Sequence, residues 1–218
     1  MNVNKTIQSG EGCVCTTNNE ELSYRLQLIR NHGEAVVGPA GYENIINIAG
    51  FNYRLSELHA AIIREQLTKL EYLNNKRLEL VQQLSEGLSK YNFLSTQRRI
   101  DLCKSTYYVY PLRFHYEKDG LKREEFITAV NAEGIHFFQG YVKPLYLQPL
   151  YQRKQLYKYD YPFSAKENQA CQMNYFEGIC PNAEKLHFQQ MIINEHVRLP
   201  HTSDDINDII KAIEKVVG

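Results

Sequence analysis

Residues 51–88 read FNYRLSELHAAIIREQLTKLEYLNNKRLELVQQLSEGL, and this stretch decides how the rest of the chain is organised. From Leu55 to Glu86 it contains neither glycine nor proline. Apolar residues recur in it at spacings of about three or four, which predicts one amphipathic helix. A helix of about 32 residues would be about 48 Å long, more than a small domain is wide. We therefore expect residues 55–90 to link two domains.

The sequence after this helix predicts a small α+β domain over residues 91–218. Short strands and helices alternate there. In chain order we expect a strand in STYYVYPLRF (105–114), a helix in KREEFITAVNAEG (122–134), a strand in IHFF (135–138), an ordered loop over 141–168, a short helix in CPNAEKLHFQQ (180–190), a strand in IINEHVRL (192–199) and a closing helix in SDDINDIIKAIEKVV (203–217).

The sequence before the helix predicts the end of a larger sheet domain over residues 1–54. CVCTT (13–17) is β-branched and rich in cysteine, as a buried strand would be. NNEELSYRLQLIRNHG (18–33) predicts a helix that begins at a capping pair, Asn18 and Glu21, and ends at Gly33. The next 20 residues contain several glycines and a proline and predict loops.

Composition excludes several kinds of partner. Lys+Arg 25 balance Asp+Glu 25, so the chain offers no electrostatic footprint for nucleic acid or an anionic membrane. No apolar run approaches the roughly 18 residues of a membrane helix, and the first residues lack the apolar stretch of a signal peptide. We therefore expect a cytoplasmic protein.

The metal-binding residue types show no metal-ligand spacing. The five cysteines contain no C-x-x-C pair, and the seven histidines are scattered. We expect buried, reduced thiols and no metal site.

The order of these segments resembles the DegT/DnrJ/StrS-type PLP-dependent nucleotide-sugar aminotransferases, which have fold type I. The resemblance covers essentially the whole chain, and it rests on NVNKTIQSGEG (2–12), the EEL…RNHG helix, FNYRLSELHAAIIREQL (51–67), YYVYPLRF (107–114), GYVKPLYLQPLY (140–151), CPNAEKL (180–186) and VRLP (197–200). It implies an α/β fold, the carboxyl-terminal part of a PLP-dependent transferase (aspartate aminotransferase-like) fold. That part has the end of the large domain, a long linking helix and a small α+β domain.

The resemblance also assigns site residues. Lys5 matches the catalytic, cofactor-binding lysine, whose primary amine must form and exchange a Schiff base with pyridoxal 5'-phosphate (PLP) and can then move a proton. Asn52 matches an asparagine that reaches the cofactor phosphate of the neighbouring subunit, so a homodimer is implied; a residue in a helix-starting turn is the alternative. His32, Arg54 and Tyr146 are candidates for substrate binding. Many relatives carry histidine where this chain has Tyr146, and a packed loop tyrosine is the alternative there.

The activity implied is transamination of a nucleotide-linked keto sugar, with glutamate as the amino donor. In this family the glycine-rich phosphate turn, the aromatic residue that stacks on the cofactor and the aspartate that pairs with its ring nitrogen would precede Met1. We therefore expect the carboxyl-terminal part of a longer enzyme, inactive alone. Lys5 argues against the related sugar dehydratases, in which histidine replaces the lysine. A non-catalytic remnant or partner module is the alternative from a different class.

Overall fold

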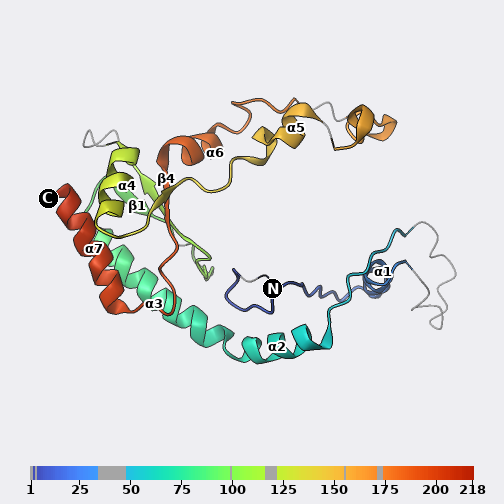
Figure 1. Cartoon of the computed structure of the whole chain (residues 1–218), viewed down its shortest axis with the longest axis horizontal. Coiled ribbons are helices and arrows are strands. Elements are labelled where there is room, and N and C mark those ends of the chain that lie inside the picture. The colour runs from blue at the N-terminus through green and yellow to red at the C-terminus, as the bar shows by residue number, and fades with distance from the viewer. Residues whose placement is uncertain are drawn as a thin grey trace. The chain divides into compact units, whose positions relative to one another are not determined.

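The computed structural model describes residues 2, 4–33, 48–98, 100–115, 122–154, 156–170 and 174–218, so the predicted loops over 34–47 and Cys171 lie outside the described residues. The chain divides into two compact units, Met1–Leu73 and Asn74–Gly218 (Figure 1). The boundary between them lies near the start of a helix. The division into 1–54, 55–90 and 91–218 stays a prediction.

The first unit contains the helices α1 (Glu20–Arg30) and α2 (Glu57–Thr68). The α1 helix is the one predicted, but its cap is Asn19 and not Asn18. The Asn19 side chain accepts a 3.0 Å hydrogen bond from the backbone nitrogen of Leu22, in the first turn of the helix. An oxygen at this position satisfies one of the amide groups that have no partner within the helix.

The long helix predicted from the sequence is two helices. After α2, the chain turns at Lys69 and continues as α3 (Leu70–Leu88). The Thr68 hydroxyl donates to the Glu65 carbonyl over 2.7 Å at this point. Such a local side-chain bond competes with regular helix hydrogen bonding. The prediction of one uninterrupted helix was wrong because the apolar spacing does not reveal this turn.

The second unit is built on a four-stranded antiparallel sheet in the order β1-β2-β4-β3. Its strands are β1 (Leu94–Thr96), β2 (Tyr110–Phe114), β3 (Phe138–Gln139) and β4 (Met191–Asn194). Its longer helices are α3, α4 (Arg123–Ala132) and α7 (Ser203–Val217). Shorter helical segments are η2 (Leu145–Leu147), α5 (Pro149–Arg153), η3 (Lys158–Asp160), η4 (Lys166–Asn168), α6 (Pro181–Lys185) and the π-helical turn η5 (Leu186–Gln190). The predicted α+β character is confirmed.

One hydrophobic core lies between this sheet and its helices. Alternate β2 residues Tyr110, Leu112 and Phe114 are buried, and Leu112 pairs with the buried Ile192 of β4. The ring of Phe114 lies 5.4 Å from that of Phe126 in α4. Burial on this scale contributes about 2 kcal/mol per large apolar side chain, which explains why the strands predicted around these residues form.

The prediction for CVCTT was wrong. Residues 13–17 are extended but do not form a strand, and all five are exposed. A strand needs a neighbouring strand to accept and donate its backbone hydrogen bonds. In the described part of the first unit, the β-type pairing consists of one isolated bridge between Asn31 and Asn52.

The prediction of buried thiols was wrong for the cysteines that the structure describes. Cys13, Cys15, Cys103 and Cys180 are all free and exposed. All four cysteines lie in segments outside the helices and strands, where few other side chains cover them.

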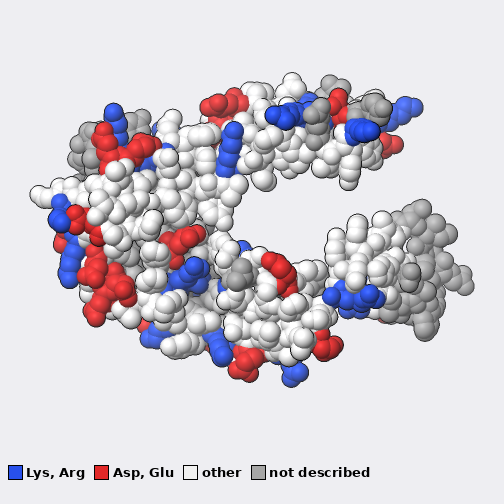
Figure 2. Space-filling view, viewed as in Figure 1, with Lys and Arg blue, Asp and Glu red and all other residues white. Residues whose placement is uncertain are grey.

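The surface mixes charges of both signs, as Figure 2 shows for one face. Among the described helices, none has both the length and the apolar character needed to cross a membrane. The first unit exposes large apolar side chains; Phe51 is 52% exposed and Leu58 is 78% exposed.

Stability of the second unit is expected to fall in acid because of a histidine cluster. The rings of His196 and His201 stack at 5.0 Å, and His136 lies 6.4 Å from His196. Burial, His201, His136 and Arg198 lower the pKa of His196, while Glu195 raises it. The unfolded chain therefore binds this proton more readily than the folded protein does. The free energy of unfolding should fall as pH decreases through the unfolded value of 6.5, by less than about 1 kcal/mol because the ring is partly exposed.

Urea unfolding at several pH values between about 8 and about 5 measures this change, and His196→Asn should flatten the dependence. If His196→Asn and the unaltered protein show the same pH dependence of the free energy of unfolding, groups other than His196 cause the loss of stability in acid.

Candidate functional site

Lys5 lies in a turn that Asn2 organises. The backbone nitrogen of Lys5 donates to the Asn2 carbonyl over 3.0 Å, and the Asn2 side chain accepts from the nitrogen of Asn4. The same side chain donates to Glu11 over 2.6 Å, which folds residues 2–11 back on themselves. The Lys5 side chain is exposed. Its position after a tight turn keeps the amine accessible to a small molecule.

The glycines that follow Lys5 bring this turn close to α2. Gly10 and Gly12 have φ values of +92° and +140°, which favour glycine. A Cβ atom at Gly12 would lie 2.8 Å from Cδ1 of Leu55, and one at Gly10 would lie 3.6 Å from Nε2 of His59. A side chain at Gly12 would therefore push the turn away from Leu55.

Asn52 and Arg54 are brought together at the end of α1. The backbone nitrogens of Phe51 and Tyr53 donate to the last carbonyls of that helix, at 2.8 and 3.0 Å. The Arg54 guanidinium then donates to Oδ1 of Asn52 over 3.1 Å and to Oδ1 of Asn31 over 2.9 Å. The arginine thus holds both amide side chains.

His32 belongs to the same segment through its backbone. Its nitrogen donates to the Phe51 carbonyl over 3.0 Å, its φ is +64°, and its side chain is exposed. The sequence predicted His32, Asn52 and Arg54, and it missed Asn31. An asparagine at the end of a helix resembles an ordinary cap, so no pattern marked it.

A groove of about 790 Å³ lies beside Arg54 in the first unit. It is lined by the extended residues 13–17, one side of α1 and residues 53–55. Arg30 and Arg54 supply positive charge, and Thr16 and Thr17 supply hydroxyl groups. The rest of its lining is largely apolar, with Val14, Leu26, Ile29, Tyr53 and Leu55, so the groove suits a ligand with an apolar part and a negatively charged group.

Tyr146 lies in the second unit, where its hydroxyl donates to Glu184 in a short hydrogen bond. The backbone nitrogen of Gly178 donates to both Glu184 carboxylate oxygens, at 2.8 and 2.9 Å. The bond from Tyr146, followed by that from Gly178, lowers the pKa of Glu184. Loss of hydration and then Glu184 raise the pKa of Tyr146. Tyr146 is therefore a half-buried, packed residue of the short helix η2, and its predicted contact with substrate stays a prediction.

Tyr146→Phe is expected to loosen the loop around Gly178. The variant keeps the ring but leaves the Glu184 carboxylate without its hydroxyl donor, so the carboxylate holds the Gly178 amide less firmly. Hydrogen exchange at Gly178 should become several-fold faster. Tyr151→Phe is the matched control, since Tyr151 contacts the ring of Tyr175 in the same part of the unit. Equal exchange in both variants would show that the hydroxyl does not hold this loop.

The residues around Lys5 fit PLP. The Ser9 side chain is only 6% exposed, and among the described residues its hydroxyl has no hydrogen-bond partner. A buried, unpaired hydroxyl is costly, so it suits a bound polar group. Lys5 has the primary amine that the cofactor aldehyde would require. In the part of the chain that the structure describes, no three His, Cys, Asp or Glu side chains gather to hold a metal ion.

Comparison with known proteins identifies the family to which the chain is similar. The sequence profile of the DegT/DnrJ/EryC1/StrS aminotransferase family matches residues 2–214. The uncharacterized protein MJ1066 of Methanocaldococcus jannaschii is 26% identical over 221 residues, which is 98% of this chain and 52% of that protein. The spore coat polysaccharide biosynthesis protein SpsC of Bacillus subtilis is 23% identical over 224 residues, 98% of this chain and 51% of SpsC. The chain thus spans about half the length of these relatives.

Solved structures show the same fold. An aminotransferase from Psychrobacter cryohalolentis superimposes with a TM-score of 0.70 at 21% identity, over 93% of this chain and 50% of that one. The protein Spr1654 of Streptococcus pneumoniae, solved in a PLP form and a PMP form, superimposes with a TM-score of 0.63 at 18% identity, over 94% and 47%. The fold is that of PLP-dependent aminotransferases of fold type I.

Proposed function

Because this chain belongs to the DegT/DnrJ/EryC1/StrS aminotransferase family, we propose that it takes part in PLP-dependent transfer of an amino group to a nucleotide-linked keto sugar. Glutamate is the proposed amino donor. The observation that carries this proposal is the accessible Lys5 amine, in a turn with the buried, unpaired hydroxyl of Ser9. A covalently held, phosphorylated cofactor requires a primary amine for the covalent link and polar groups to bind the phosphate.

Each proposed site residue has a role that its chemistry allows. Lys5 holds the cofactor through its ε-amine and, once released, carries the proton that transamination moves at the substrate carbon. When bound, PLP supplies the electron sink for that step. Asn52 donates to the cofactor phosphate of a neighbouring subunit, and Arg54 keeps the Asn52 amide oriented. His32, Arg54 and Tyr146 are the proposed contacts to substrate.

The proposed assembly is a homodimer in the cytoplasm. The exposed side chains of Phe51 and Leu58 lie beside Asn52 in the sequence, and apolar side chains exposed in this way are typical of surfaces that another chain covers. A dimer contact here would bring Asn52 to a second subunit, as its role requires.

Transfer of the amino group from glutamate tests the proposal. The 218-residue chain alone is expected to bind PLP weakly, because it spans half of the family fold, and to release no 2-oxoglutarate. A protein that supplies the remaining half should convert PLP to its amine form and release one equivalent of 2-oxoglutarate. Release by the chain alone would contradict the expectation of inactivity. If neither the chain alone nor the protein with the remaining half releases 2-oxoglutarate, the result would favour a non-catalytic partner module.

A further inference from the structure

A second groove, of about 620 Å³, lies wholly within the second unit and is here called the α3 groove. One wall is a face of α3, and the other is the segment 97–107, which follows β1. The helix contributes Asn75, Leu78, Glu79 and Gln82, whose spacing places them on one side of a helix. The volume lies in the range of pockets that bind small molecules.

The segment 97–107 is held against α3 without a ligand. The Arg77 guanidinium donates to the Thr106 carbonyl over 3.1 Å, and the Lys104 ammonium donates to Oδ1 of Asn75 over 3.2 Å. Tyr107, at the end of the segment, is only 8% exposed and belongs to the hydrophobic core. Because both walls are already fixed to each other, a ligand would enter the α3 groove at little conformational cost.

Part of the α3 groove is apolar. Leu78 packs against the hydrophobic core, and Tyr107 is part of that core. Ile100, on the same segment, is 68% exposed, so most of its apolar surface is in contact with water. A ligand with an apolar body would remove this surface from water, which favours binding.

The charged side chains of the α3 groove favour an anion. Arg98 and Lys104 carry positive charge there, and Glu79 carries negative charge. Glu79 is already paired with Lys76 at 2.7 Å. Among the residues that the structure describes, the exposed Arg98 side chain has no acidic partner. Its guanidinium is therefore available, and its planar fork of donors matches a carboxylate.

The position of Glu79 also limits the charge of the ligand. A carboxylate on the same groove repels a second negative charge, so a ligand with one negative charge is favoured over a dianion such as a phosphate monoester. The α3 groove thus offers one guanidinium, one ammonium group and an apolar patch to a singly charged molecule.

We propose that the α3 groove binds a small free carboxylate that has an apolar body. The carboxylate pairs with Arg98 and Lys104, and the apolar body packs on Ile100 and Leu78. This inference goes beyond the proposed transamination and uses neither Lys5 nor the cofactor. Cys103 lines the same groove with a free, exposed thiol, so a bound ligand should cover it.

Alkylation of the 218-residue chain by iodoacetamide, with 2-naphthoate as the probe, tests the proposal. The rate at each cysteine is measured by mass mapping of the peptides. Bound 2-naphthoate should slow alkylation of Cys103 several-fold. Cys180 is the internal control, because it is a free, exposed thiol elsewhere in the second unit, and its rate should not change. The concentration that gives half of the protection reports the Kd. The uncharged 2-naphthamide has the same rings and should protect Cys103 only at several-fold higher concentration.

Variants of the charged residues test how the carboxylate is bound. Arg98→Gln and Lys104→Gln should each weaken binding of 2-naphthoate roughly threefold, as expected for partly exposed ion pairs. Lys211→Gln is the matched control, because Lys211 is an exposed lysine on α7, and it should leave the Kd unchanged. Glu79→Gln should tighten binding, because it removes a like charge. A variant that had merely lost its fold would not bind more tightly.

Three results would overturn the proposal. The first is equal slowing of Cys103 and Cys180, or no slowing of either. The second is equal protection by 2-naphthoate and 2-naphthamide. The third is the same Kd in Arg98→Gln and Lys211→Gln. None of them would bear on Lys5, so failure here is distinct from failure of the proposed transamination.

Discussion

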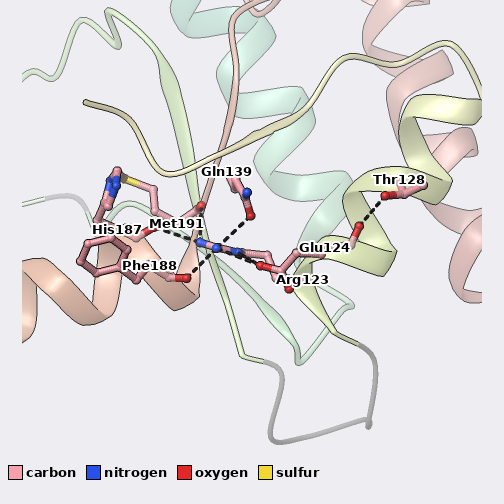
Figure 3. A network of polar contacts seen from close by, with 7 residues as sticks. All are labelled: Arg123, Glu124, Thr128, Gln139, His187, Phe188 and Met191. Carbon is pink, nitrogen blue, oxygen red and sulfur yellow. Dashed lines mark hydrogen bonds and ion pairs between the residues drawn. The ribbon is translucent and has the colours of Figure 1, made fainter. Parts of the chain in front are cut away.

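Arg123→Ala is expected to lower the free energy of unfolding of the second unit by about 3 kcal/mol or more. The side chain is only 5% exposed, although it begins a helix. Its guanidinium donates to three backbone carbonyls of η5 and β4, those of His187, Phe188 and Met191, at 3.1, 2.6 and 3.4 Å, as Figure 3 shows. It also donates to Oε1 of Gln139 at 3.0 Å and to Glu124. Alanine would leave the acceptors of these part-buried hydrogen bonds without their donor. That loss costs more than the hydrogen bonds themselves contribute.

The loss in free energy of unfolding should be much larger for Arg123→Ala than for removal of an exposed lysine. Lys211→Ala is the control, because Lys211 is exposed and pairs with Asp208 at 3.4 Å on the surface of α7. Its removal should change the free energy of unfolding by less than about 0.5 kcal/mol. Arg123→Lys should fall between the two, since an ammonium group cannot reproduce the planar fork of donors. Urea unfolding followed by circular dichroism measures all three.

A loss below about 1 kcal/mol in Arg123→Ala would show that water or other groups satisfy these carbonyls.

The fold of the second unit could be predicted from the sequence wherever local patterns and packing agree. SDDINDIIKAIEKVV forms α7 over the predicted residues, because its apolar side chains recur at helical spacing and its first turn is acidic. The turn at Lys69 could not be predicted, because Leu67, Leu70 and Leu73 continue the apolar spacing through it. The hydrogen bonds of Arg123 could not be predicted either. They go to backbone carbonyls 64 to 68 residues away, and every residue has a carbonyl, so the sequence does not mark these partners.

The candidate site shows the same limit. Lys5 and Asn52 were predicted from the order of the motifs, through the family resemblance, and both assignments stay predictions. Asn2 and Asn31, which hold the Lys5 turn and Arg54, are short polar residues in ordinary turns. Ser9 could not be singled out, because burial without a partner appears only when the neighbours are in place.

Lys5→Ala is expected to abolish transamination, by a factor of about 10³ or more, in a protein that supplies the remaining half of the family fold. Alanine removes both the amine that holds the cofactor and the group that moves the proton. Lys5→Arg should be as inactive, because a guanidinium keeps the charge but cannot form the covalent link. Lys69→Ala is the control, since Lys69 is an exposed lysine of the same unit, paired with Glu65 at 3.8 Å. Turnover is measured as the release of 2-oxoglutarate from glutamate.

The most direct test of the central claim is reduction with borohydride in the presence of PLP, followed by mass mapping of the peptides. In the protein that supplies the remaining half of the fold, the account predicts that the cofactor is fixed on Lys5 in good yield. Lys5→Ala should lose this label while Lys69→Ala keeps it. In the 218-residue chain alone the label on Lys5 should be weak. A cofactor fixed predominantly on another lysine, or an undiminished label in Lys5→Ala, would contradict the assignment of Lys5.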